Sequence, residues 1–184
     1  TEPEQDNNST EQPGGSQDED SGEEQERKVY FTNPVINSDV PDICITRVGE
    51  DYYMVSTTMY FMPGAPIMHS KDLVSWKIIG YVFDSLDESA ANNLEQNEDG
   101  KSDIYAEGQW ASSIRYHDGW FYVMFATGFK SFNHTYIYKT QDPAGEWQLA
   151  QTFDEILHDS SLFFEDDGTP FIITFKGEII ELYK

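Results

Sequence analysis

The chain has 184 residues, the size of one ordinary domain, and carries 34 Asp and Glu against 11 Lys and Arg, a formal net charge of −23. So acidic a surface repels phosphate groups, which argues against nucleic acid and anionic membranes as partners and leaves neutral ligands and cations open. The chain has one cysteine, Cys44, so it cannot form an internal disulfide. No apolar run reaches the 18 residues expected of a transmembrane helix.

The first segment, residues 1–28, contains no aromatic residue and no aliphatic residue larger than proline. Such a segment cannot bury enough apolar surface to offset its ordering entropy, so we predict a disordered acidic linker. The functional alternative is an extended spacer that holds a folded domain away from an N-terminal tether.

The remainder, residues 29–184, is dense in aromatic residues and is predicted to be one folded all-β region. Three runs rich in aromatic and β-branched residues predict strands, namely YYMVSTT, GWFYVMFAT and TPFIITF. Each run follows turn-forming residues, which are Gly49-Glu50-Asp51, His117-Asp118-Gly119 and Asp166-Asp167-Gly168. The sequence predicts no amphipathic helix in this region.

The strands recur in three similar units, which begin near residues 41, 110 and 158. A full unit has a short apolar strand, a tight turn, two further strands and a polar turn followed by Trp. Units of roughly 40–50 residues with four short strands are typical of β-propeller blades, whose first strand lies nearest the central axis. The alternative is a β-sandwich with coincidental similarity between its parts.

Aligning the first strands places Asp42, Ala111 and Asp159 at one equivalent position. Two carboxylates at the inner ends of inner strands would face each other at the mouth of the channel. Such crowding perturbs pKa values in the way that acid–base chemistry requires. The structural alternative is that each Asp caps a turn.

The chain resembles glycoside hydrolase family 43 over residues 32–184. The resemblance is carried by NPVINSDVPDICITRVGEDYYMVSTT, PGAPIMHSKDLVSWKIIGYVF, GQWASSIRYHDGWFYVMFAT and HDSSLFFEDDG. It implies a five-bladed β-propeller, of which about three blades are present in residues 29–184, the N-terminal part of a catalytic domain.

The resemblance also implies roles for the two carboxylates in single-displacement hydrolysis with inversion. Asp42 stands where the family has its general base, and Asp159 stands where it has an Asp that orients the general acid and tunes its pKa. The family's acid is a Glu in a Glu-Gly context on a later blade, and no Glu-Gly pair follows Asp159. Glu178 and Glu181 lie in a strand-like run that does not fit, so we expect the acid beyond residue 184 and an inactive fragment.

Two neighbours of these carboxylates depart from the family's pattern. Ile43 follows Asp42 and Ser160 follows Asp159, where the family often has proline. The departures affect the expected local geometry and leave the assignments in place.

Two aromatic residues are candidates for binding a sugar. Trp110 resembles the family's pocket-lining Trp, and Phe132 lies in a loop that could reach the rim of the pocket. Sugar CH faces stack on aromatic rings, whereas packing between blades is the alternative for Trp110. The sequence has no phosphate loop and no zinc-ligand spacing, so we expect neither cofactor nor metal.

The resemblance implies a glycosidase of the α-L-arabinofuranosidase or β-xylosidase type acting on pentose-containing plant oligosaccharides or polysaccharides. The acidic linker and polymeric substrate favour an extracellular, periplasmic or cell-surface location. The alternatives are a non-catalytic carbohydrate-binding propeller, and a propeller used as a platform for protein interactions.

Overall fold

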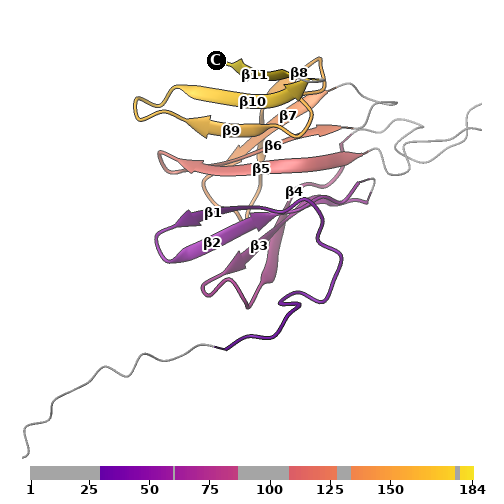
Figure 1. Cartoon of the computed structure of the whole chain (residues 1–184), viewed down its shortest axis with the longest axis vertical. Helices are drawn as coiled ribbons and strands as arrows, with labels where there is room; N and C mark the ends of the chain where they lie inside the picture. Colours follow the sequence, from indigo (N-terminus) through magenta and orange to yellow (C-terminus); the bar gives the residue numbers. More distant parts are fainter. Residues whose placement is uncertain (1–29, 60, 87–107, 128–133, 177–178) are drawn as a thin grey trace, which may run out of the picture. The chain divides into compact units, whose positions relative to one another are not determined.

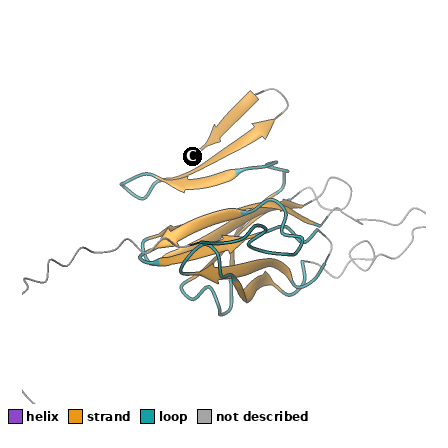
Figure 2. Cartoon of the chain, turned by 60° about the horizontal axis from the view of Figure 1, so that its bottom comes forward, coloured by secondary structure: helices purple, strands orange, loops and turns teal. Residues whose placement is uncertain are grey.

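A computed structural model describes residues 30–59, 61–86, 108–127, 134–176 and 179–184. Residues Phe31–Lys184 form one compact unit. In the described residues every regular element is a β-strand, so the expected all-β class is confirmed (Figure 2). The described part of the chain has no helix capable of crossing a membrane.

The strands form three antiparallel sheets, each ordered as the chain runs (Figure 1). The first contains β1 (Cys44–Val48), β2 (Asp51–Val55), β3 (Gly64–Ser70) and β4 (Lys77–Phe83). The second contains β5 (Gln109–His117), β6 (Trp120–Thr127), β7 (Thr135–Thr140) and β8 (Gln148–Phe153). The third contains β9 (Ser161–Phe164), β10 (Pro170–Lys176) and β11 (Ile179–Tyr183). The repeat seen in the sequence is therefore a repeat of sheets.

The turn between the first two strands of each sheet has a glycine in the left-handed region. The φ angles are 62° at Gly49, 82° at Gly119 and 85° at Gly168. Glycine adopts this conformation without the steric cost that a Cβ atom imposes, which explains why the predicted turns occur at these residues.

The third strand of the first two sheets ends in the same polar turn. The Asp72 backbone N–H donates to Ser70 Oγ at 3.1 Å, and the Asp142 N–H donates to Thr140 Oγ1 at 3.2 Å. In each turn the Asp carboxylate then accepts a backbone N–H two residues further on. Such local bonds stop the strand and start the next one.

The sheets pack face to face through two apolar clusters. The cluster between the first and second sheets contains Val55, Ile67, Phe83, Ile114 and Phe125 among its buried members, and the cluster between the second and third contains Met124, Leu157, Leu162 and Ile172. The first strands β1, β5 and β9 contact one another in turn. The functional residues expected at the starts of these strands are therefore brought to one edge of the packed sheets.

Candidate active site

Asp42 and Asp159 each lie two residues before a first strand, Asp42 before β1 and Asp159 before β9. Both have left-handed backbone conformations, with φ of 51° and 45° respectively. Asp and Asn enter this region more readily than most residues with a side chain. The sequence alignment that paired these two positions is thus matched by the same backbone conformation.

The backbone around the two residues is also held in the same way. The Thr57 N–H donates to the Pro41 carbonyl at 3.1 Å, and the Phe175 N–H donates to the His158 carbonyl at 3.4 Å. In both cases the acceptor directly precedes the Asp. The donor Thr57 follows the second strand β2, whereas the donor Phe175 lies near the end of the second strand β10. Thr174 Oγ1 adds a bond of 3.0 Å to the His158 carbonyl.

The third aligned position, Ala111, lies inside β5. The register of β5 against β6 shifts between Gln109 and Ser112, which brackets Ala111. A bulge therefore stands in the second sheet where the other two sheets have a left-handed Asp.

The structure brings Trp110 and Asp159 together through His158. His158 Nδ1 lies 3.3 Å from Asp159 Oδ2, and the His158 and Trp110 rings meet edge to face with centroids 5.6 Å apart. His158 directly precedes Asp159 in the chain. In the fold it joins a candidate sugar-binding ring to a candidate catalytic carboxylate.

Both carboxylates are open to solvent. The Asp159 side chain is 60% exposed and Asp42 is an exposed residue. Among the residues that the structure describes, Asp42 has no ion-pair partner, so its carboxylate is accessible to water and to a ligand. Phe132, the other predicted binding residue, lies outside the described residues.

Gln109 is a residue of this region that the sequence reasoning missed. It is fully buried, and its side-chain amide bonds to Ser56 and Thr58, which follow β2, and to Trp110 and Ser112 of β5. The available signal was a large polar residue directly before Trp110, at the start of a strand whose Ser112, Ser113 and Ile114 are buried. Its partners after β2 are more than 50 residues away in the chain and could not be read from local pattern.

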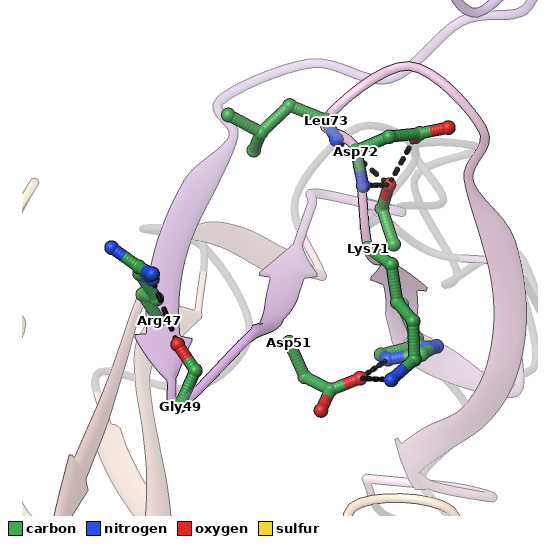
Figure 3. A network of polar contacts seen from close by, with 8 residues as sticks. Arg47, Gly49, Asp51, Lys71, Asp72 and Leu73 are labelled. Atoms are coloured by element: carbon green, nitrogen blue, oxygen red, sulfur yellow. Dashed lines mark hydrogen bonds and ion pairs between the residues drawn. The ribbon is translucent and has the colours of Figure 1, made fainter. Parts of the chain in front are cut away.

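The best-connected ion pairs of the first sheet lie at the other end of its strands (Figure 3). Asp51 Oδ1 contacts His69 Nε2 at 2.6 Å and Lys71 Nζ at 3.3 Å. The His69 hydrogen bond, with a further contribution from Lys71, lowers the pKa of the Asp51 carboxyl. Asp51 begins β2 and pairs with Val48 at the far end of β1 from Asp42. At about 3.3 Å per strand residue, Asp51 and Asp42 are about 20 Å apart. This network therefore lies away from Asp42 and links the start of β2 to the end of β3.

Comparison with known proteins shows the family to which the chain is related. The sequence profile of the family described as glycosyl hydrolases family 43 matches residues 31–181. A non-reducing end α-L-arabinofuranosidase of Bacteroides ovatus is 40% identical over 118 residues, 64% of this chain and 21% of that protein. A β-xylosidase of Formosa agariphila is 32% identical over 141 residues, 74% of this chain and 22% of that protein.

Solved structures show the same relationship. A bifunctional GH43-CE protein of Bacteroides eggerthii has a TM-score of 0.73 and 41% identity, over 84% of this chain and 20% of that one. The expected propeller architecture is confirmed, and the chain spans about a fifth of the length of the curated relatives named above.

Proposed function

The chain belongs to glycosyl hydrolase family 43, and from that premise we propose that its protein hydrolyses O-glycosidic bonds in arabinose- or xylose-containing plant oligosaccharides or polysaccharides. One observation carries the proposal for this chain. Two exposed Asp residues, Asp42 and Asp159, have the same left-handed conformation two residues before the first strands of two sheets, and the His158 ring contacts both Asp159 and the Trp110 ring.

In the proposed mechanism Asp42 is the general base. It removes a proton from a water molecule that attacks the anomeric carbon on the face opposite the leaving group, so the configuration inverts. An inverting enzyme needs about 6.5–9.5 Å between its two catalytic carboxyl groups to admit that water. The solvent exposure of Asp42 supports this role, because the carboxylate can accept the proton of a water molecule.

Asp159 is proposed to orient the general acid and raise its pKa by its negative charge. The acid itself, a Glu that protonates the leaving oxygen, is proposed to be contributed from outside residues 1–184. Trp110 is proposed to stack on a sugar ring, with Phe132 at the rim. We accordingly propose that the 184-residue chain alone has no activity.

The cellular location is part of the proposal. A polymeric plant substrate and the acidic segment 1–28 support an extracellular, periplasmic or cell-surface protein with an N-terminal tether. Neither a cofactor nor a resident metal has a part in the mechanism.

The test is hydrolysis of aryl arabinofuranosides and aryl xylosides by the complete protein that contains this chain. We expect Asp42→Asn to reduce kcat by about 10²–10⁴-fold, the usual contribution of general acid–base catalysis. We expect Asp159→Asn to move the alkaline limb of the kcat profile to lower pH, because the charge that raises the pKa of the acid is removed.

Asp118→Asn is the matched control. Asp118 is exposed and has a left-handed φ of 45°, but it lies in the β5–β6 turn. It should retain full activity. A folded Asp42→Asn variant with normal kcat contradicts the base assignment. A complete protein that binds xylan or arabinan without cleaving any pentoside supports the non-catalytic binding propeller instead.

A further inference from the structure

We propose that Gln109 is a positioning residue that fixes the placement of Asp42 relative to Trp110, an inference that rests on the proposed function. Gln109 is the first residue of β5 and is fully buried between the first two sheets. It contacts neither candidate catalytic carboxylate, so its effect on the site must pass through the backbone that it holds.

The Gln109 side chain uses both ends of its amide. Its Oε1 accepts from the Thr58 N–H at 2.8 Å and from Thr58 Oγ1 at 2.9 Å. Its Nε2 has two hydrogens and three oxygens within hydrogen-bond distance, the Trp110 carbonyl at 2.7 Å, Ser112 Oγ at 2.7 Å and the Ser56 carbonyl at 3.3 Å. A buried amide with all its partners in place is rigid, since breaking any bond leaves a buried polar group unsatisfied.

The orientation of this amide is fixed by the chemistry of its partners. The Thr58 N–H can only donate and therefore faces the oxygen. The Trp110 and Ser56 carbonyls can only accept and therefore face the nitrogen. Reversing the amide would set like groups against each other on both sides, so Gln109 has one state.

The hydrogen bonds of Gln109 to Ser56 and Thr58 connect it to Asp42. Ser56 and Thr58, both bound to Gln109, flank Thr57, whose N–H donates to the Pro41 carbonyl at 3.1 Å. Pro41 directly precedes Asp42, which is left-handed and exposed. The Gln109 amide thus holds the segment on which the backbone of Asp42 is anchored.

The hydrogen bonds of Gln109 within β5 connect it to Trp110. Gln109 Nε2 binds the carbonyl of Trp110 and the hydroxyl of Ser112 across the register shift of β5. The Gln109 and Met59 backbones also exchange hydrogen bonds of 2.8 and 3.0 Å, which ties the two sheets at the same point. The Gln109 side chain therefore joins the segment that anchors Asp42 to the strand that carries Trp110.

A positioning role predicts a loss of turnover in a folded protein. In the complete protein we expect Gln109→Glu to lower kcat on aryl pentosides by about 10–100-fold, since displacing a reacting group by about 1 Å costs up to 10²-fold. The introduced carboxylate faces the Trp110 and Ser56 carbonyls. It can donate to one of them only when protonated, so the kcat ratio of variant to wild type should fall as pH rises.

The matched control is Gln151→Glu. Gln151 is exposed on β8, and its Nε2 donates only to the neighbouring Thr152 carbonyl among the contacts described. The same chemical change there should leave kcat, KM and their pH dependence unchanged. Circular dichroism and thermal melting establish that both variants are folded.

A double-mutant cycle with Asp42 separates positioning from general destabilisation. If Gln109 acts through Asp42, then Gln109→Met should cost much less in kcat in the Asp42→Ala background than in the wild-type background. A structural role predicts the same fold loss in both backgrounds. The cycle uses Gln109→Met, so it can still be measured if Gln109→Glu fails to fold.

The outcomes separate this inference from the proposed function. If the wild-type protein cleaves pentosides and folded Gln109 variants keep wild-type kcat, or if the two losses multiply, the positioning role is wrong. If the folded wild-type protein cleaves no pentoside, the proposed function fails. In that case the inference fails with it, because there is no turnover for Gln109 to support.

Discussion

Asp42 and Asp159 combine an uncommon backbone conformation with an exposed carboxylate. The left-handed region costs an L-residue roughly 1–2 kcal/mol, a cost that glycine does not bear. Glycine occupies the left-handed positions of the hairpin turns at Gly49 and Gly168, where no side chain is required. Asp118, Met59, Ala65 and Leu73 also have positive φ angles. The backbone conformation therefore supports the proposed roles of Asp42 and Asp159 only together with their matched positions before two first strands.

Asp72 offers a pH-dependent test of a structural carboxylate. The backbone N–H groups of Ser75 and Val74, then the Ser70 hydroxyl, lower the pKa of Asp72 well below its ordinary value of 3.8. Figure 3 shows Asp72 in this turn. Because the folded pKa is depressed, the stabilisation is fully present above about pH 4 and is lost as pH falls through the folded pKa.

We therefore expect Asp72→Asn to lower the melting temperature of the complete protein at pH 6 and to lose most of that difference near pH 2. The measurement is thermal melting of both proteins across this range, with Asp166→Asn, an exposed change in the β9–β10 turn, as control. An equal difference at both pH values would contradict the electrostatic origin of the effect.

At the scale of elements, the position of β6 between two apolar clusters explains why its sequence is apolar almost without interruption. Phe121, Val123 and Phe125 pack into the cluster with the first sheet, whereas Tyr122 and Met124 face the cluster with the third. Successive residues of a strand point to opposite faces, so a sheet covered on both sides needs apolar residues at both parities.

The strand predicted at YYMVSTT is shorter in the structure than in the sequence. β2 ends at Val55, and Ser56–Thr58 leave the hairpin to bind Gln109 and the segment before β1. β-propensity favours the longer strand, but the contacts with the second sheet satisfy these backbone groups instead. The departure occurs where the candidate site is built.

Packing within the first sheet is tight at Gly64. A Cβ atom there would overlap the Phe83 ring, which is itself buried and lies 5.2 Å from the Phe125 ring between centroids. We expect Gly64→Ala to destabilise the complete protein by about 1–3 kcal/mol, the usual cost of overpacking a core. Urea unfolding measures the change.

Gly49→Asn is the control for that experiment. A Cβ atom at Gly49 meets nothing within 4 Å, and Asn tolerates the left-handed φ of 62°. Gly49→Asn should lower the free energy of unfolding by much less than Gly64→Ala. If Gly64→Ala melts like the wild type, the Phe83 ring is free to move aside and the packing argument is wrong.

At the scale of the whole molecule, the third sheet buries one face and leaves the other apolar face open. The buried face carries Leu162 and Ile172 against Met124. The open face carries cross-strand pairs from β10 and β11, with Ile173 (40% exposed) opposite Leu182 (60%) and Phe175 (51%) opposite Ile180 (75%). An apolar sheet face of this kind promotes association.

We expect residues 29–184, produced alone, to aggregate or to form large oligomers. Phe175→Ser combined with Leu182→Ser should reduce the oligomer size by removing part of the open face, as measured by size-exclusion chromatography with light scattering. Leu149→Ser, a change at a 53% exposed leucine on β8, is the control and should have little effect. A monomeric wild-type product that melts cooperatively would contradict this prediction.

The sequence by itself determined the features that short-range chemistry encodes. Strand runs and positive-φ glycines such as Gly49 and Gly168 could be read because a strand and its turn depend on neighbouring residues. Asp42 and Asp159 could be aligned because each sheet repeats the same local pattern, and the family resemblance supplied their roles, which remain predictions.

Only the tertiary structure decided how those residues are held together. It placed His158 between Trp110 and Asp159, and it joined Gln109 to Ser56 and Thr58 across more than 50 residues of chain. Such contacts form when separate sheets pack, and a single buried amide or ring leaves no periodic pattern in the sequence. The candidate residues could therefore be named from the sequence one by one, whereas their arrangement came from the packing of one sheet against the next.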